Sequence, residues 1–178
     1  APNQHSAKVM LQHDLGLFIH YSFSIITPRP YNARMQKTLI LLKPDAVTKK
    51  CCGKVLSRFE EAGFKVLACK MIKLSSEVLR EHYAHIADKP FFPEVENFMS
   101  MTPVIAMVLE GENVIDKTRD ILGVTDCTEA APGTIRDEFG NKDSATCKMM
   151  NIAHASDSEE NAEIEVKRFF EEGEIFEY

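Results

Sequence analysis

Hydrophobic and polar positions follow two different periods along the chain from Lys37 onward. Short apolar or alternating runs such as "KTLILLK" and "PVIAMVLEG" are typical of buried strands. The segments between these runs place apolar residues three or four positions apart, as amphipathic helices do. Strands are predicted at 37–43, 64–74, 103–111 and 149–155. Helices are predicted at 53–63, 77–88, 89–101, 113–123 and 156–170, with an ordered loop at 124–140.

The order of these segments leaves the fold class open. Strands that alternate with helices favour a parallel sheet, but a set of four strands also suits a compact α+β sandwich. The sequence has no internal repeat and no low-complexity stretch. At 178 residues the chain is expected to form one domain with a sizeable core.

Residues 1–34 differ in character from the rest. They hold a single acidic residue, Asp14, and their apolar run at 15–26 is interrupted by polar residues. A signal or transit peptide would place basic residues before a cleaner apolar or amphipathic segment. We therefore expect residues 1–34 to be an N-terminal extension, disordered or non-native, and residues 35–178 to form the domain.

Charge and cysteine content narrow the range of functions. The formal net charge of −6 repels nucleic acid and anionic membranes, so an anionic ligand would need a local cluster of cations. The five cysteines are odd in number and form no CxxC pair, which favours reduced thiols and a cytoplasmic location. No apolar run reaches the roughly 20 residues of a membrane-spanning helix. Neither nucleic acid nor a membrane is expected as a partner.

Common phosphate and metal signatures are missing from the sequence. It contains neither GxxxxGK[ST] nor GxGxxG. His82 and His85 lie three positions apart on a predicted helix, but no HExxH order and no cysteine partner accompany them. We interpret both histidines as part of an ordinary amphipathic helix surface and assign them no metal.

His154 stands out by its surroundings in "NIAHASDS". The small neighbours Ala153 and Ala155 are expected to leave its ring accessible, at a strand end where functional groups are common. Ser156 can hydrogen-bond nearby, and Glu165 could turn back from the following helix to hold one ring nitrogen. The other nitrogen would then be a nucleophile or base. The alternatives are a structural histidine and a solvated glutamate.

Four further residues suit phosphate. Lys43 ends the first predicted strand, Arg119 lies on a predicted helix, and Thr125 and Arg136 lie in the predicted loop. Brought together, they would offer point and forked donors to a polyphosphate. Each one alone is an ordinary surface cation or loop hydroxyl, so the interpretation depends on their convergence.

Six motifs, in this order and nearly this spacing, resemble the nucleoside diphosphate kinase family: "KPDAV", "EHY", "KPFF", "GVTD", "APGTIR" and "NIAHASDS". The resemblance extends from Met35 to Phe176, and the last motif is highly specific to the family. Met35 also falls where such enzymes commonly begin, which favours upstream translation as the origin of residues 1–34.

The resemblance implies a fold and a reaction. Family members are α+β proteins with a ferredoxin-like βαββαβ sandwich, a four-stranded antiparallel sheet covered by helices. They transfer the γ-phosphate of a nucleoside triphosphate, usually ATP, to a nucleoside diphosphate by a ping-pong reaction. Matching positions make His154 the nucleophile that becomes phosphohistidine. Glu165 and Ser156 would orient it, and Tyr83 would stand close to its ring.

The resemblance also assigns the nucleotide-binding positions, which are Lys43, Phe91, Arg119, Thr125, Arg136 and Asn151. The three cations and Thr125 would hold the phosphates, Asn151 with Lys43 the sugar hydroxyl, and Phe91 the base. Stacking on an aromatic face accepts any base, so broad nucleotide specificity is expected. A core position is the alternative for Phe91, and Phe92 beside it is the better candidate for that place.

Cofactor and partners follow from the same resemblance. Mg²⁺ is expected to bridge phosphate oxygens with few or no protein ligands. A homo-oligomer is expected, a hexamer or tetramer, with a dimer as the alternative. A catalytically silent nucleotide-binding or regulatory module is the alternative function, although such a chain would be expected to lose His154, Lys43 or Arg136.

Three features depart from the family pattern. Ala155 stands where many members have glycine, which is a mild change. The segment 137–150 is a few residues longer than usual, so the wall opposite Phe91 is not assigned. The chain stops soon after Phe176, without the longer tail of some members.

Overall fold

The computed structural model describes residues 34–143 and 149–178, all of which belong to the unit formed by residues 32–178. The strands of the main sheet are β1 (Met35–Leu42), β2 (Lys65–Ile72), β3 (Val104–Glu112) and β6 (Ala153–Ala155). The helices are α1 (Pro44–Thr48), α2 (Cys52–Glu61), α3 (Ser76–His82), α4 (Phe92–Ser100), α5 (Val114–Leu122), α6 (Ile135–Phe139) and α7 (Glu159–Phe169), followed by the 3-10 turn η1 (Glu172–Glu174). Two short strands, β4 (Asn141–Lys142) and β5 (Met149–Met150), pair separately.

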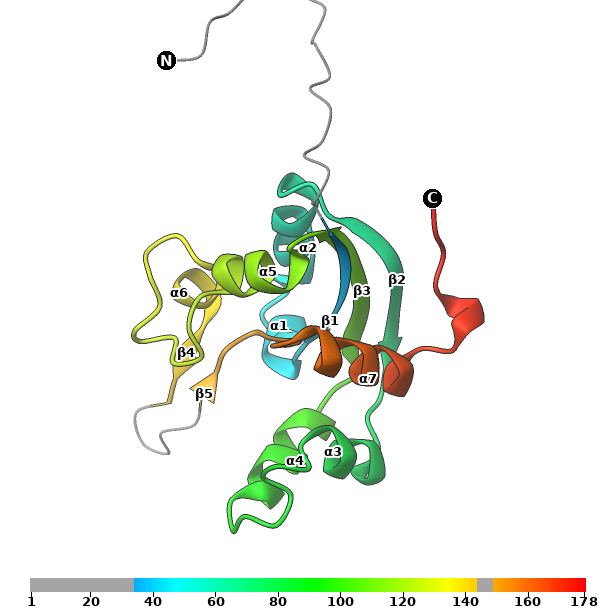
Figure 1. Ribbon diagram of the computed structural model, residues 1–178. Helices are drawn as coiled ribbons and strands as arrows, with labels where there is room; N and C mark the ends of the chain where they lie inside the picture. Colours follow the sequence, from blue (N-terminus) through cyan, green and yellow to red (C-terminus); the bar gives the residue numbers. More distant parts are fainter. Residues whose placement is uncertain (1–33, 144–148) are drawn as a thin grey trace, which may run out of the picture. The chain divides into compact units, whose positions relative to one another are not determined.

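A four-stranded sheet in the order β2-β3-β1-β6 forms the centre of this unit (Figure 1). Every neighbouring pair of strands is antiparallel. Strand β1 pairs with β3 along its whole length, and its last residues pair with β6, so that Leu41 lies opposite His154. The predicted antiparallel α+β sheet is confirmed, and the parallel alternative is wrong.

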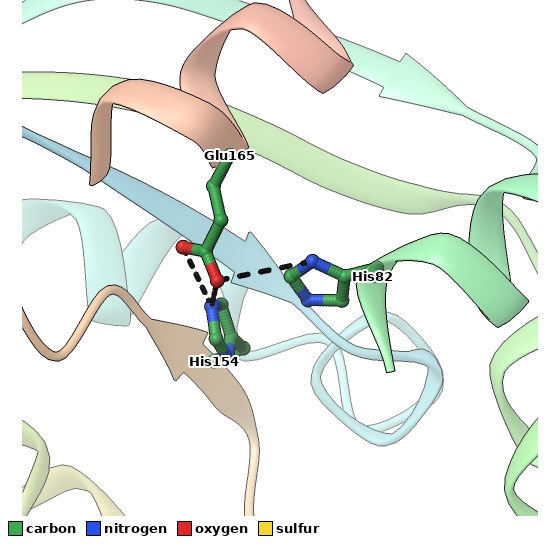
Figure 2. Close-up of side chains that lie close together, drawn as sticks. All are labelled: His82, His154 and Glu165. Carbon is green, nitrogen blue, oxygen red and sulfur yellow. Dashed lines mark hydrogen bonds and ion pairs between the residues drawn. The ribbon is translucent and has the colours of Figure 1, made fainter. Parts of the chain in front are cut away.

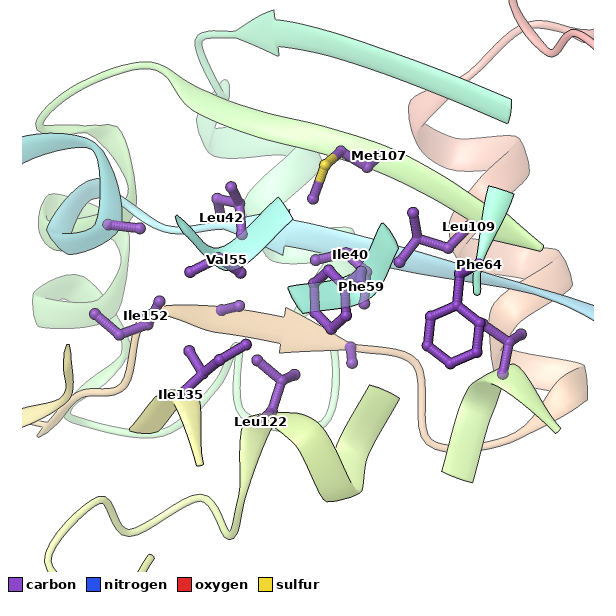
Figure 3. Packing of buried hydrophobic residues seen from close by; sticks show 14 of the residues in the cluster. Ile40, Leu42, Val55, Phe59, Phe64, Met107, Leu109, Leu122, Ile135 and Ile152 are labelled. Atoms are coloured by element: carbon purple, nitrogen blue, oxygen red, sulfur yellow. The ribbon is translucent and has the colours of Figure 1, made fainter. Parts of the chain in front are cut away.

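Both faces of the sheet are covered at β1, whose residues alternate between two hydrophobic clusters. Ile40 and Leu42 pack with residues of α2 and α5, whereas Leu39 and Leu41 pack with residues of α3, α4 and α7. Figure 3 shows the first cluster, in which Phe59 of α2 lies against the β1 side chains. Each fully buried side chain of this size stabilises the fold by about 1.5 to 3 kcal/mol. The sheet is therefore a firm support for residues at its edge.

Some elements differ from those predicted. Helices α1 and α6 have five residues each, too few to display a hydrophobic period, and α6 lies inside the segment predicted as a loop. The predicted strand at 149–155 is broken at Ile152, whose φ is 71°. Because this backbone conformation cannot continue a ladder, β5 pairs with β4 while β6 pairs with β1. The lengthened segment before Asn151 thus contains a short hairpin.

The prediction for residues 1–34 lies outside the described residues, apart from Arg34. Arg34 pairs with Glu159 at the start of α7, at 2.9 Å. The extension and the domain boundary at residue 35 stay predictions. Within the described part of the chain, no helix combines the length and the apolar character needed to cross a membrane.

Candidate active site

His154 is presented by β6, the edge strand beside β1. Neighbouring residues of a strand point to opposite faces. Ala153 and Ala155 pack into the cluster beneath α2 and α5, whereas the His154 ring emerges toward α3 and α7 and its side chain keeps 24% of its surface exposed (Figure 2). The sequence suggested that these small neighbours make room for the ring. They do not, because they fill the core on the opposite face of the strand. The Ala155 methyl lies there too, away from the ring.

Glu165 holds one nitrogen of the His154 ring (Figure 2). Its two carboxylate oxygens lie 2.9 and 3.0 Å from Nε2. The Ser156 hydroxyl donates to the same carboxylate at 2.6 Å and accepts from the backbone N–H of Leu39 at 3.1 Å, which ties the carboxylate to β1. Because a carboxylate only accepts, Nε2 carries the proton and Nδ1 keeps its lone pair.

Helix α7 brings Glu165 to this position. The Ser158 hydroxyl caps the first turn of the helix, where acidic residues also favour the helix dipole. Val166 packs against the sheet, and this orientation turns Glu165 inward. Burial alone would raise the pKa of Glu165, but the hydrogen bonds from His154 and Ser156 outweigh burial and lower that pKa below its ordinary value. The carboxylate stays charged at neutral pH.

His82 lies beside this pair, where the sequence did not place it. Its ring centroid is 4.6 Å from that of His154, and its Nδ1 is 3.9 Å from a Glu165 oxygen. The His82 side chain is 1% exposed, and burial lowers its pKa to about 3, so the ring is neutral. The prediction that His82 belongs to a helix surface is wrong, whereas His85 is exposed. The available signal was its spacing of three from Leu79, a buried residue of the same helix face.

Tyr83 reaches the site through the neighbouring His82 ring. The two ring centroids are 4.8 Å apart in a T-shaped arrangement. Burial, reinforced by the charge of Glu165, raises the pKa of Tyr83 well above its usual value, so the phenol stays protonated. Tyr83 therefore adds a neutral wall to the site rather than a second base.

Lys43 and Asn151 form the second part of the site. The Lys43 ammonium donates to the Asn151 side-chain oxygen at 2.7 Å, and the Asn151 amide donates to the backbone carbonyl of Thr125 at 2.9 Å. Burial, followed by the charge of Arg136, lowers the pKa of Lys43 to about 8. The fold therefore brings together Lys43, Thr125, Arg136 and Asn151, which come from four separate segments of the chain.

Arg136 is held by three backbone carbonyls. Its Nε donates to Asn151 at 3.2 Å, its Nη1 to Gly123 at 2.7 Å and its Nη2 to Ala153 at 2.8 Å. A guanidinium has five N–H groups, so two remain for a ligand. Burial, followed by the charge of Arg119, lowers the pKa of Arg136 to about 10. Arg119 itself is exposed on α5, and its charge acts on Arg136.

Phe91 and Phe92 occupy different environments. Phe91 precedes the first turn of α4 with 48% of its surface exposed, and Phe92 is 1% exposed within the core. An exposed aromatic face beside a buried one matches the requirement for a stacking surface on a rigid support.

The side chains of the site differ in what they could bind. His82, His154 and Glu165 hold their ligand atoms within 4.8 Å of one another, which is close enough for a shared metal ion. The carboxylate is already engaged by His154 and Ser156, however, and Mg²⁺ prefers oxygen to nitrogen ligands. Around Lys43 the groups are cations and an amide, which favour an anion.

Comparisons with known proteins place the chain among relatives of one family. The family model described as nucleoside diphosphate kinase matches residues 36–175. A nucleoside diphosphate kinase of Rhodopirellula baltica is 44% identical over 144 residues, which are 81% of this chain and 91% of the relative. The Aquifex aeolicus nucleoside diphosphate kinase has a TM-score of 0.73 at 44% identity, covering 80% of this chain and 99% of that one. A transition-state mimic of the Borrelia burgdorferi enzyme, with bound vanadate and ADP, has a TM-score of 0.75 at 33% identity over 81% of this chain and 92% of that one.

Proposed function

The chain belongs to the nucleoside diphosphate kinase family and has the activity of a nucleoside diphosphate kinase, and on this premise we propose which residues carry the phosphoryl transfer. The observation that carries the proposal is the bond between Glu165 and Nε2 of His154, at 2.9 Å. This bond fixes the tautomer and leaves Nδ1 as the nucleophile.

His154 acts in two half-reactions. In the first, the Nδ1 lone pair forms a bond to the γ-phosphorus of a nucleoside triphosphate, with ATP as the usual donor. The bond from that phosphorus to the bridging oxygen breaks, and its electron pair leaves with the nucleoside diphosphate. In the second, a terminal phosphate oxygen of another nucleoside diphosphate attacks the same phosphorus, and the electron pair of the N–P bond returns to Nδ1. Glu165 stabilises the positive character that the ring acquires in between.

The cations act on the phosphates. Phosphoryl transfer depends mainly on positioning and on neutralising charge in the transition state. Lys43 and the two remaining N–H groups of Arg136 are proposed to hold the transferring group, with Arg119 and the Thr125 hydroxyl on the neighbouring phosphates. Because Arg136 is already fixed by three carbonyls, it loses little freedom when a nucleotide binds.

Asn151 and Phe91 are proposed to hold the nucleoside. Asn151, together with Lys43, would bind the sugar hydroxyl, and the exposed ring of Phe91 would stack on the base. Since every base has a π face, Phe91→Ala should weaken purine and pyrimidine nucleotides alike, by about 1 to 3 kcal/mol. Calorimetric titration with ADP, GDP and CDP measures this, and a loss confined to one base would contradict the stacking role.

Magnesium is proposed to arrive as part of the substrate. The family requires a divalent metal in general. When bound to the nucleotide, Mg²⁺ neutralises part of the phosphate charge. On the protein side of this site, Lys43 and Arg136 would bind phosphate oxygens and leave the cation to the nucleotide.

Assembly and location are the last part of the proposal. Strand β2 lies at the edge of the sheet, and an edge of this kind can be covered by a second copy, so a homo-oligomer is proposed, a hexamer or tetramer as the family resemblance implies. Light scattering tests it as a multiple of the 20.1 kDa chain mass. The free thiols of Cys51, Cys52, Cys69 and Cys127 support a cytoplasmic location.

Intact mass spectrometry tests the proposed function. Brief incubation with ATP and Mg²⁺ should add one acid-labile phosphoryl group, and added GDP should remove it. His154→Ala should bind ADP with nearly unchanged affinity and show no gain, because its ring is a nucleophile rather than a core residue. A folded wild-type chain that binds nucleotide and gains no mass would favour the silent binding module instead.

A further inference from the structure

The turn before His154 has an unfavourable backbone. Ile152 has a φ of 71°, in the left-handed region that β-branched residues rarely adopt. The N–H of Ala153 donates to the carbonyl of Asn151 at 2.8 Å, so Ile152 is the centre of a γ-turn with positive φ, a rare and strained form. Such strain persists only where the surroundings impose it, and it concentrates at functional sites.

This turn sets the position of two proposed site residues at once. Asn151 immediately precedes Ile152 and bonds to Lys43 at 2.7 Å, and His154 follows two residues later in β6. Relaxing the turn would move the sugar and phosphate contacts relative to the nucleophile.

Three groups hold the turn in place. The backbone N–H of Lys43 donates to the carbonyl of Ile152 at 2.8 Å, and Arg136 donates to the carbonyls on either side of it. The N–H of Ile152 donates to Oδ2 of Asp45 at 2.8 Å. Because Ile152 is fully buried, Asp45 gives its N–H a hydrogen-bond acceptor out of contact with water.

The Asp45 carboxylate is more costly to bury than a single structural hydrogen bond to Ile152 requires. It is 3% exposed in α1, and its other oxygen, Oδ1, is buried without a hydrogen-bond partner among the described residues. Burying a half-satisfied carboxylate costs stability. Its negative charge also acts on both Lys43 and Arg136, where it raises the pKa against the larger effect of burial.

We propose that Asp45 is a positioning residue for the phosphoryl transfer, which holds the strained turn at Ile152 so that Asn151 and His154 lie in register. The proposal rests on the proposed role of His154 as the nucleophile. The Asp45 charge itself opposes phosphate binding, since it lies beside the cations that would hold the phosphates. Loss of that charge would also lower the pKa of Lys43 further, which weakens a proposed phosphate contact. Asp45→Ala and Asp45→Asn share both effects of the lost charge, so a larger loss of rate in Asp45→Ala must come from the turn.

The test is the single-turnover rate of phosphohistidine formation from ATP and Mg²⁺ in the full chain, well below the thermal midpoint of each variant. At saturating ATP, Asp45→Ala should lower this rate about 100-fold, as a misplacement of roughly 1 Å does. Asp45→Asn keeps an oxygen for the Ile152 N–H and should lose about tenfold or less.

A glycine at the turn provides the decisive control. Glycine adopts a positive φ without strain, so in an Ile152→Gly background Asp45→Ala should cost about tenfold or less. Ile152→Ala removes nearly as much of the side chain as Ile152→Gly does, but it keeps the Cβ that causes the strain. In the Ile152→Ala background, the loss caused by Asp45→Ala should therefore stay near 100-fold.

The outcomes separate this proposal from the proposed function. Absence of phosphohistidine in the wild-type chain would refute the role of His154 itself. With a phosphorylated wild type, equal losses for Asp45→Ala and Asp45→Asn, or equal losses in the Gly and Ala backgrounds, would overturn the positioning role of Asp45. If Asp45→Ala does not fold, Asp45→Asn is measured alone and in the Ile152→Gly background: a smaller loss with glycine supports the proposal, and equal losses in the two overturn it.

Discussion

The site consists of two halves that are held in different ways. In the nucleophile half, His154, Glu165 and Ser156 are joined by side-chain hydrogen bonds of 2.6 to 3.0 Å. In the phosphate half, Arg136 is held by backbone carbonyls and Lys43 by an amide oxygen. The first half must fix a proton on one ring nitrogen, which needs a charged acceptor. The second half must hold its cations at fixed positions. Neutral acceptors do this without cancelling the positive charge.

The largest effect is expected where the phosphate half meets the strained turn. Arg136→Ala removes two donors proposed for the phosphates and leaves three carbonyls without their partner. We expect kcat/KM to fall about 10³-fold, and the free energy of unfolding to fall by about 2 kcal/mol. Steady-state kinetics and urea unfolding measure both.

Arg119→Ala is the matched control for this substitution. Arg119 carries the same charge but is exposed on α5. We therefore expect Arg119→Ala to lower kcat/KM less than Arg136→Ala does and to leave the free energy of unfolding unchanged. Equal losses of stability in the two variants would contradict the structural part of the comparison.

The next effect concerns the nucleophile half. Glu165→Gln keeps the shape of the side chain but removes the charge that stabilises the ring, so kcat should fall about 10²-fold while the affinity for ADP stays unchanged. Glu163→Gln, at an exposed position of the same helix, should leave both unchanged. A weakened affinity with an unchanged kcat in Glu165→Gln would place this carboxylate in the binding half instead.

The smallest expected effect is on the pH dependence of stability, and it concerns His82, which packs beside the nucleophile half. Burial lowers the pKa of His82 to about 3 in the folded chain from its ordinary value of 6.5. Between these values the unfolded chain binds one more proton, so stability is full above pH 6.5 and is lost as the pH falls. His82→Phe should reduce the slope of unfolding free energy against pH by up to about 1.4 kcal/mol per unit.

Urea unfolding between pH 4 and 7 measures this slope, with His85→Phe as the control at an exposed position. A slope that does not differ between wild type and His82→Phe would mean that His82 is not kept neutral by burial.

Prediction from sequence succeeded where a pattern is long or a motif is specific. The apolar runs located β1 and β3 within a few residues. The fold places His154 against Glu165 and Lys43 against Asn151, while the roles that the family motifs assign to them stay predictions. Periodicity alone could not choose between parallel and antiparallel strands, because pairing depends on contacts between distant segments.

The failures have physical causes of their own. Helices α1 and α6 are shorter than two turns, so no period could reveal them. A strand pattern also could not show the break at Ile152, since a β-branched residue favours the extended conformation that it does not adopt here. Its anchor, Asp45, sits in "KPDAV" as an ordinary acidic residue at the start of a helix, and only the fold places its carboxylate against the Ile152 N–H.

The most direct test of the account is the identity of the phosphorylated nitrogen. Chain labelled with ¹⁵N-histidine is incubated with ATP and Mg²⁺, and the ring nitrogens are examined by ¹⁵N–³¹P correlation NMR. Because Glu165 occupies Nε2, the phosphorus should be bonded to Nδ1 of His154 alone, and the signal should disappear when GDP is added. Phosphorus on Nε2, or on any residue other than His154, would contradict the account.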